Sequence, residues 1–320
     1  MKKKIALVGA GNWGKNHLRN LYDMGVLNLV LEKSDDIISK RREDFPDVNF
    51  VKHEKFVIDN IDIKGVVIAA PAVLHFELAK KYLLAEKDVM VEKPLALTIE
   101  EGEELVNIAQ KEKRILMVGH ILQYHPAVVK LKEMIDRGDL GKIRYIYSNR
   151  LNIGKLRTEE NVLWSFAPHD ISIILMLMGE EEPEKVSAFA GSYLNQAIFD
   201  TTLTELEFNN GVKAHIFVSW LHPFKEQKLV VIGSEKMAVF DDVSKEKLFI
   251  YEHKIKWEKG KIPIAEKADY KVVQFEKKQP LREELLHFIE SIKNRQTPKT
   301  DAKEGLRVLK VLNEAEKSLH

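Results

Sequence analysis

Two stretches of the sequence carry a side chain that can move a proton. Lys93 lies in Glu92-Lys93-Pro94, directly after the apolar run 89–91. A lysine at a strand end can hydrogen-bond a hydroxyl group, and partial burial or a neighbouring positive charge lowers its pKa. His169 lies in the aromatic-rich stretch 164–170, and a histidine titrates near neutral pH. Both are candidate general bases. The alternatives are a surface lysine and a partly buried structural histidine beside an Asp170 that caps a helix.

A glycine turn near the start of the chain can hold phosphate groups. Gly9-Ala10-Gly11-Asn12-Trp13-Gly14 follows the apolar run 5–8 and precedes a helix-compatible segment, 15–24. The first glycine permits the tight turn, the second lets the backbone approach a pyrophosphate, and the third lets the helix pack close to the strand. Free N–H groups at the helix start favour negative charge. The pattern predicts a dinucleotide site, the alternative being a turn that serves only chain geometry.

A second apolar run, 27–31, ends at Glu32, where the dinucleotide pattern requires an acid. We expect this carboxylate to accept hydrogen bonds from the adenosine ribose and to repel a 2′-phosphate, which favours NAD over NADP. Lys33 and Ser34 could each contact a 2′-phosphate, so NADP remains possible. The residues expected to bind the cofactor are Gly9, Gly11, Asn12, Trp13, Gly14, Glu32, Lys33, Ala70, Pro71, His75, Glu92 and Lys93.

Strand and helix patterns alternate from residue 4 to about residue 119, which predicts a doubly wound parallel sheet of the Rossmann type. Thr98 and Glu101 form the sequence of a capping box at the start of one helix. Ligands of such sheets bind beyond the carboxyl ends of the strands, where the glycine turn and Lys93 are expected to lie. The stretches 69–71 and 119–120 are expected at the same edge.

The pattern changes after about residue 122 and predicts an α+β domain with a large, mainly antiparallel open sheet and helices on one face. The Asn209-Asn210-Gly211 turn predicts a hairpin. A loop at 164–167 is expected to enter a helix at Pro168, and the Lys-rich stretch 254–271 is expected to be a surface loop. We predict a Rossmann domain at 1–121, a second domain at 122–301 and a last helix at 302–318. The strands predicted for this sheet are 142–150, 186–194, 201–208, 213–220, 228–232, 237–240 and 248–251, and the other predicted helices are 126–137 and 281–293.

Composition narrows the functional classes. The 320 residues are 45% hydrophobic and 31% charged, as in globular proteins, and the net charge of +1 gives no electrostatic case for nucleic acid or an anionic membrane. No cysteine is present, which excludes disulfides, thiolate metal sites and thiol catalysis. No segment approaches the length of a membrane span. We expect a cytoplasmic protein without a metal site.

These motifs together resemble the Gfo/Idh/MocA oxidoreductase family over nearly the whole chain. The turn at Gly9 to Gly14 looks like the cofactor turn of that family, Glu92-Lys93-Pro94 resembles its signature tripeptide, and His169 falls where it carries a catalytic histidine. The resemblance implies that Lys93 and His169 handle the proton while hydride passes to or from the nicotinamide. It also implies that 122–301 is a substrate-binding and oligomerisation domain and that the last helix, 302–318, packs back on the Rossmann domain. The expected assembly is a homodimer or homotetramer built through the C-terminal sheet.

One position departs from the family pattern. Many members carry an aspartate four residues before the histidine, and this chain has Ser165. Either His169 works without that partner or Asp170 supports it, so the identity of the base stays open. The departure points away from inositol dehydrogenases, and the runs 148–154 and 164–170 are similar to the nucleotide-sugar branch, the UDP-N-acetylglucosamine and UDP-N-acetylglucosaminuronate 3-dehydrogenases.

The resemblance therefore implies an NAD-dependent dehydrogenase acting on C3 of a UDP-amino sugar. The alternatives are a dehydrogenase of a free sugar, inositol or another polyol, and a non-enzymatic NAD-binding sensor. Arg150 and Arg157 could clamp a phosphate or carboxylate, although surface arginines are commoner. The residues expected to hold the substrate are Lys93, Tyr124, His125, Arg150, Arg157, Trp164, Ser165, His169 and Asp170.

Overall fold

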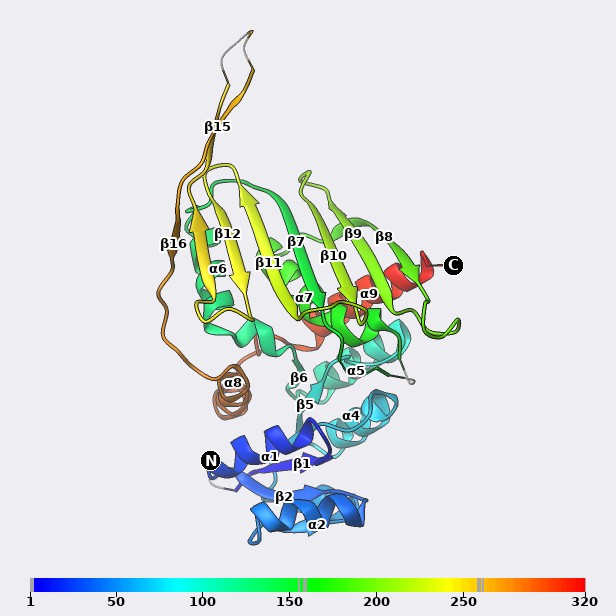
Figure 1. Cartoon of the computed structure of the whole chain (residues 1–320). Helices are drawn as coiled ribbons and strands as arrows, with labels where there is room; N and C mark the ends of the chain where they lie inside the picture. The colour runs from blue at the N-terminus through cyan, green and yellow to red at the C-terminus, as the bar shows by residue number, and fades with distance from the viewer. Residues whose placement is uncertain (1–2, 155, 158–159, 258–259, 261, 320) are drawn as a thin grey trace. The chain divides into compact units, whose positions relative to one another are not determined.

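The structure is a computed structural model that describes residues 3–154, 156–157, 160–257, 260 and 262–319 (Figure 1). Its internal contacts divide the chain into two compact units. The first unit comprises residues 1–124 and 279–310, and the second comprises residues 125–278 and 311–320. Within the described residues, no helix has the length and apolar character needed to cross a membrane.

The first unit is built on a parallel sheet of six strands in the order β3-β2-β1-β4-β5-β6. This is the strand order of the doubly wound dinucleotide-binding fold, which confirms the Rossmann prediction. The strands are β1 (Ile5–Val8), β2 (Leu27–Leu31), β3 (Phe50–Val51), β4 (Gly65–Ile68), β5 (Asp88–Glu92) and β6 (Leu116–Gly119). The helices are α1 (Gly14–Asp23), α2 (Asp35–Asp44), α3 (Lys55–Ile58), η1 (Ala72–Leu74), α4 (His75–Leu84), α5 (Ile99–Lys111) and η2 (Ile121–Tyr124).

Both faces of this sheet are buried, which explains the unbroken apolar runs of its strands. Alternate residues of each strand enter two separate clusters, so that Ile5 and Leu7 join one and Ala6 and Val8 join the other. One cluster includes side chains of α4 and α5, and the other includes side chains of α1, α2 and α8 (Pro280–Asn294). The Thr98 capping box predicted at the start of α5 is present.

Helix α8 belongs to the first unit, whereas the sequence-based boundaries placed residues 279–301 in the second domain. The reason is an apolar stripe on α8 that completes one face of the Rossmann core. Its members are Leu281, Leu285, Phe288 and Ile292, and all four are buried in the cluster that contains Ile5 and Leu7. The last helix, α9 (Ala302–Lys317), is shared, because residues 302–310 belong to the first unit and residues 311–317 to the second.

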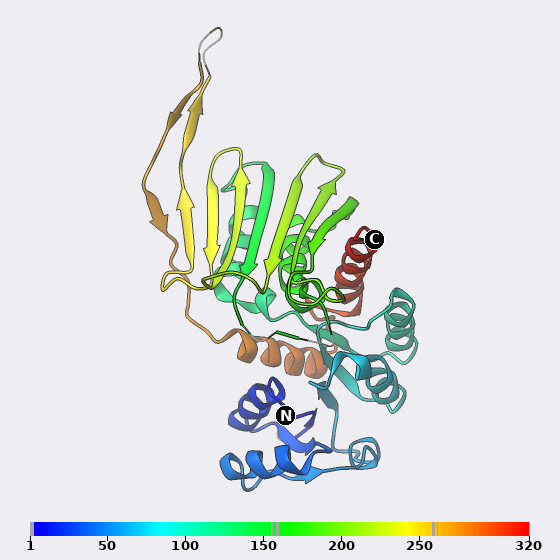
Figure 2. The ribbon, with the colours of Figure 1, turned by 45° about the vertical axis from the view of Figure 1, so that its right-hand side comes forward.

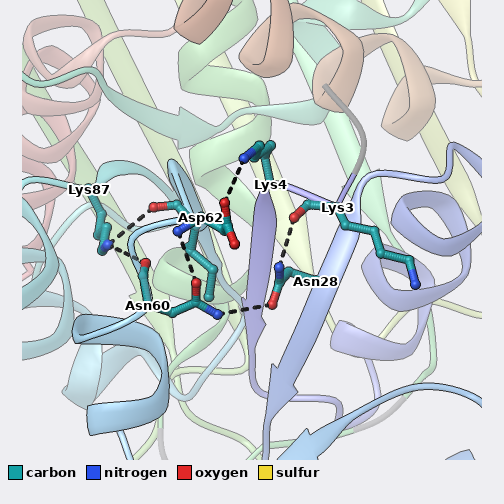
Figure 3. Close-up of polar contacts among 7 residues, drawn as sticks. Lys3, Lys4, Asn28, Asn60, Asp62 and Lys87 are labelled. Atoms are coloured by element: carbon teal, nitrogen blue, oxygen red, sulfur yellow. Dashed lines mark hydrogen bonds and ion pairs between the residues drawn. The ribbon is translucent and has the colours of Figure 1, made fainter.

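The amino edge of the parallel sheet is held by polar contacts rather than by a ligand (Figure 3). Lys4 Nζ lies 3.0 Å from Asp62 Oδ1, and Lys87 Nζ donates to the carbonyl oxygens of Asn60 and Ile63 at 2.8 and 3.1 Å. A hollow of about 570 Å³ at this edge is also lined by Lys87 and Arg295. Since Arg295 is bonded to Asp88 and to the carbonyl oxygen of Lys113, these two lining cations serve the fold.

The second unit is an open sheet of eight strands in the order β16-β13-β12-β11-β7-β10-β9-β8, with helices α6 and α7 packed against it (Figure 2). Only β7 and β10 pair in parallel within this sheet as described, which confirms a mainly antiparallel sheet. The Asn210-Gly211 turn joins β9 and β10 as predicted. The strands are β7 (Ile143–Leu151), β8 (Pro183–Gly191), β9 (Thr201–Phe208), β10 (Lys213–Ser219), β11 (Glu226–Gly233), β12 (Met237–Asp241), β13 (Leu248–Tyr251) and β16 (Tyr270–Val272), and the helices are α6 (Pro126–Asp136) and α7 (Val162–Met178).

Two local predictions in this unit are wrong. Helix α7 begins at Val162, because the Asn161 side chain caps it by accepting from Trp164 N, and Pro168 therefore lies inside the helix rather than at its start. The stretch 254–271 was predicted to be a loop, but it contains β14 (Lys254–Lys256), β15 (Ile264–Glu266) and part of β16. The pair β14–β15 forms a two-stranded sheet that projects from the eight-stranded sheet (Figure 1).

Candidate active site

The glycine turn between β1 and α1 has the geometry that its sequence requires. Gly9 has a positive φ of 90°, and a Cβ there would lie 2.7 Å from Ala69 O. A Cβ on Gly14 would lie 2.2 Å from Gly9 O, so only glycine lets α1 start this close to the turn. A Cβ on Gly11 would meet no protein atom within 4 Å. Because Gly11 has no side chain, the space beside its backbone is open to a ligand.

Glu32 is held beside this turn by backbone groups. Its carboxylate accepts hydrogen bonds from Ala10 N at 2.8 Å, Lys33 N at 2.8 Å and Ser34 N at 3.0 Å. These bonds fix the carboxylate at the end of β2, and Oε2, which accepts only the bond from Ala10 N among them, keeps a lone pair that can accept from a ribose hydroxyl. The acid of the dinucleotide pattern is thus oriented by the chain itself.

The two residues that could favour a 2′-phosphate have partners in the structure. Lys33 Nζ lies 3.7 Å from Glu54 Oε1, and Ser34 Oγ accepts from Ile37 N as the cap of α2. Arg41 donates from Nε to Ala10 O at 2.9 Å. Lys33, Ser34 and Arg41 thus each contact other groups of the first unit.

Glu92 ties the end of β5 to the start of α1. Its Oε1 accepts from Trp13 Nε1 at 2.5 Å and from His17 Nε2 at 2.6 Å. Burial alone would raise the pKa of Glu92, but the hydrogen bond and charge of His17, together with Trp13 and Lys93, hold that pKa below its ordinary value. Glu92 is therefore ionised at neutral pH, with Lys93 as the next residue along the chain.

The Lys93–Pro94 peptide bond is cis. Buried His75 spans the two neighbouring loops, with Nδ1 2.7 Å from Pro94 O and Nε2 3.0 Å from Ala70 O. Three predicted cofactor residues, Ala70, His75 and Glu92, thus fix the strand-end loops to one another and to the glycine turn. Pro71 precedes η1 at the same edge.

In the second unit, Ser165 and His169 lie one turn apart on α7 and share a helix face. The carboxylate that many family members carry four residues before the histidine would occupy this same face. Ser165 is 3% exposed and His169 is partly buried. The helix thus explains the spacing of four residues, although the loop expected before Pro168 does not exist.

Asp170 directly follows His169 on α7, and adjacent residues of a helix point in different directions. Its carboxylate accepts from Arg150 Nε at 2.7 Å, from Arg150 Nη2 at 3.1 Å and from Ser148 Oγ at 2.6 Å. Arg150 and Asp170 are both buried. This bidentate ion pair joins β7 to α7, so both predicted substrate residues also have a structural role.

Other predicted substrate residues also have structural partners. Tyr124 is buried, and its hydroxyl lies 3.0 Å from Thr300 Oγ1. His125 caps α6 by accepting from Ala127 N at 3.1 Å, and burial lowers its pKa. Trp164 is buried in α7, whereas Arg157 is half-exposed and paired with Glu160 at 2.8 Å. Of these residues, Arg157 remains accessible to a ligand.

The first unit fits a nicotinamide dinucleotide on three structural grounds. The space beyond Gly11 is open, α1 begins directly at the glycine turn with the positive end of its dipole, and the Glu32 carboxylate is held in place at the end of β2. Gly9, Gly11, Gly14 and Glu32 would hold the dinucleotide, and NAD would supply the acceptor or donor of a hydride. Among the described residues, no group of three or more acidic or histidine side chains could hold a metal ion.

The sequence analysis missed His17, which is fully buried and bonded to Glu92. The available signal was its place four residues after Trp13, since that spacing puts both side chains on one helix face. It also missed Glu284 of α8, a fully buried acid. Sequence spacing gives no signal for Glu284, because its neighbours come from β5, β6 and η2.

Comparison with known proteins gives two family matches. The model described as "Oxidoreductase family, NAD-binding Rossmann fold" matches residues 3–120, and the model of the Gfo/Idh/MocA C-terminal domain matches residues 128–239. Together they cover more than half of the chain.

Several relatives are similar over their full length. UDP-N-acetylglucosamine 3-dehydrogenase of Acidithiobacillus ferrooxidans is 24% identical over 96% of this chain and 94% of its own. A solved structure of that enzyme has a TM-score of 0.87 at 22% identity, covering 100% of this chain and 98% of that one. Myo-inositol 2-dehydrogenase of Thermotoga maritima is 23% identical over 99% and 96% of the two chains. A levoglucosan dehydrogenase complex with NADH and levoglucosan has a TM-score of 0.83 at 19% identity, covering 99% and 97%.

Proposed function

The chain belongs to the Gfo/Idh/MocA family of NAD-binding oxidoreductases, and from that premise we propose that it oxidises the C3 hydroxyl of a UDP-amino sugar with NAD. The observation that carries the proposal is the Glu92-Lys93-Pro94 tripeptide beside the glycine turn. Glu92 is bonded to Trp13 and His17, which fixes Lys93 at the carboxyl end of β5, where dinucleotides react in this fold.

Lys93 and His169 are the proposed proton-handling groups. Glu92 is ionised next to Lys93, so it stabilises the ammonium that forms when the lysine takes a hydroxyl proton. His169 is the titratable side chain on the Ser165 face of α7. Serine carries no charge, so position 165 does not supply the carboxylate that many family members place before the histidine. In this proposal Lys93 is the base, because ionised Glu92 precedes it, and His169 is a hydrogen-bonding partner of the substrate.

The nucleotide-sugar class is supported by full-length similarity to the Acidithiobacillus enzyme. Arg157 offers a cation for a diphosphate, and its exposed side chain can exchange Glu160 for a ligand. Trp164, Ser165 and Lys93 complete the proposed substrate contacts. NAD is preferred over NADP in this proposal, because Glu32 is fixed beside the turn and Lys33 faces Glu54.

Oxidation of a free sugar or polyol is the second candidate, because a myo-inositol 2-dehydrogenase is similar over nearly the whole chain. The two candidate functions differ only in the substrate that they predict. NAD reduction is measured with UDP-N-acetylglucosamine, UDP-N-acetylglucosaminuronate, myo-inositol and glucose. Reduction with a nucleotide sugar and not with myo-inositol supports the first candidate, and the reverse result supports the second.

Lys93→Ala and His169→Ala test the proposed roles on whichever substrate is active. Each should lower kcat by about 100-fold or more, the usual contribution of a positioned general acid or base, while NAD affinity stays within a few-fold of wild type. His53→Ala, a change at an exposed histidine of the first unit, is the control. Wild-type turnover by both active-site variants would contradict the assignment.

We also propose that two or four copies assemble through the face of the eight-stranded sheet that α6 and α7 leave open. That face carries partly exposed aromatic side chains, with Tyr147 stacked on His215 at 5.4 Å and Tyr145 hydrogen-bonded to His215. Light scattering tests the assembly, because one chain has a mass of 36.9 kDa. A dimer or tetramer mass that falls to this value in Tyr147→Glu supports the proposal, and a monomer mass for the wild type contradicts it.

A further inference from the structure

A group of buried polar side chains in the first unit has no place in the chemistry described so far. Glu284 of α8 is fully buried, and His120, directly after β6, is 1% exposed. Among the described residues, neither carboxylate oxygen of Glu284 nor either ring nitrogen of His120 has a hydrogen-bond partner. Four buried polar atoms without partners are costly to the fold, and an apolar residue at either position would avoid that cost.

These side chains stand directly behind the catalytic tripeptide. Glu92 of β5 pairs with Gly119 of β6, so Lys93 and His120 are the next residues on two adjacent parallel strands. The charges of Glu92 and Lys93 both act on His120, and the charge of Glu92 acts on Glu284. Helix α8 packs on η2, which begins immediately after His120. The group therefore extends from the tripeptide to α8.

The other end of the group reaches the surface. Lys299 is an exposed residue whose Nζ lies 4.6 Å from the ring centroid of Tyr124 and donates to Gln123 O at 2.8 Å. Its charge acts on Glu284. His287 of α8 packs its ring 5.4 Å from that of Tyr124. The titratable groups that interact electrostatically with Glu284 are Glu92, Tyr124 and Lys299. The charge of Glu92 also acts on His120, and that of Lys299 also acts on His287.

Burial favours the neutral form of both unpartnered side chains. Burial, and then the negative charge of Glu92, raise the pKa of Glu284 well above its ordinary value against the opposing effect of Lys299. Burial lowers the pKa of His120 to about 4. A protonated acid can donate a proton and accept another, and a neutral imidazole can accept at one nitrogen and release from the other.

We propose that Glu284 and His120 hold a buried chain of water molecules that carries the hydroxyl proton from Lys93 to Lys299 and solvent. Buried polar atoms without protein partners are typically hydrated, and no metal-binding group exists among the described residues to explain them otherwise. The inference rests on the proposed function, because it supplies the exit for the proton of that reaction.

The balance of the step is simple. The hydroxyl proton passes to the Lys93 amine, and the resulting ammonium gives one proton to the chain. His120 takes one proton and releases one, and Glu284 passes its carboxyl proton on and takes the incoming one. Every relay group ends in its starting state, and one proton enters solvent. Glu284 is in this scheme a positioning residue that also exchanges a proton.

Glu284→Gln tests the neutral acid without any substrate. The pKa of Glu284 is higher in the folded chain than in the unfolded chain. Its contribution to the free energy of unfolding is therefore complete below the unfolded pKa and decreases as the pH rises towards the folded pKa. Glutamine has no proton to lose. The Tm of Glu284→Gln should therefore increase relative to the wild-type Tm as the pH rises, by about 2–4 °C at pH 8. Glu290→Gln, the same change at an exposed position of α8, should leave the profile unchanged.

Infrared spectroscopy and crystallography give two further readouts. The wild type should show the C=O band of a protonated carboxyl group at pH 7, and Glu284→Gln should lose it. A crystal structure of the wild type should show water bonded to Glu284 and His120. Parallel Tm profiles, no carboxyl band, or a dry site would each overturn the proposal.

Measurements of kcat then show whether Glu284 takes part in a proton relay or has only a structural role. On the active sugar, Glu284→Gln should lower kcat by about 10-fold and raise its solvent isotope effect, with KM and NAD affinity unchanged. An unchanged kcat and isotope effect would overturn the relay even if the acid is neutral. If the wild type turns over no sugar, both the proposed function and the proton relay are contradicted. The Tm and infrared measurements still show whether Glu284 is protonated.

Discussion

At the scale of single residues, charged groups of the first unit are oriented before any ligand binds. Three backbone N–H groups fix Glu32, while Trp13 and His17 fix Glu92. Fixed dipoles and charges of this kind need no reorganisation during a reaction, which is where enzymes gain most electrostatic stabilisation. In the second unit, Asp170 is oriented in the same way by Arg150 and Ser148.

The charge of Glu32 should set the cofactor preference. Glu32→Gln keeps the side-chain volume but removes the charge that repels a 2′-phosphate, so the ratio of NAD to NADP affinity should fall by about 10-fold, or about 1.4 kcal/mol. Titration calorimetry with both cofactors measures the ratio. Glu43→Gln, at an exposed position of α2, is the matched control. A ratio that stays at the wild-type value would show that another group makes the selection.

At the scale of elements, the glycine turn separates a packing requirement from a binding requirement. A methyl group on Gly14 would collide with Gly9 O, whereas a methyl group on Gly11 would meet no protein atom. The two glycines thus serve different purposes: Gly14 serves the approach of α1 to the turn, and Gly11 serves the approach of a ligand.

This difference can be measured with two alanine variants. Gly14→Ala should destabilise the fold by about 1–3 kcal/mol, the cost of overpacking, with a lower Tm in the absence of cofactor. Gly11→Ala should keep the wild-type Tm without cofactor and should lose most of the stabilisation that NAD gives. Equal NAD stabilisation of Gly11→Ala and the wild type would mean that the dinucleotide does not pass over this turn.

Elements with strong local signals were predicted well. The Thr98–Glu101 capping box starts α5, and the Asn210-Gly211 turn closes the β9–β10 hairpin. Helix α7 was predicted too short because Pro168 looked like a helix start, while the real cap is Asn161. Because α7 begins at Val162, both Ser165 and His169 belong to it and share one face of the helix.

At the scale of the whole molecule, the sequence predicted a Rossmann unit and a second unit with an open sheet, and both are present. The assignment of α8 could not be predicted, because an amphipathic helix does not encode which sheet its apolar stripe covers. Leu285 and Phe288 pack on strands more than two hundred residues earlier in the chain. Glu284 was hidden for the same reason, since its neighbours come from distant segments.

The central claim is that the substrate is a UDP-amino sugar oxidised at C3. The most direct test follows the hydrogen atom on C3 into the reduced cofactor. The protein is incubated with NAD and UDP-N-acetylglucosamine that carries deuterium at C3, and the reduced cofactor is analysed by mass spectrometry. The account predicts deuterium in the reduced nicotinamide and a slower reaction than with the unlabelled sugar. Reduced cofactor without deuterium, or no reduction while myo-inositol is oxidised, would contradict it.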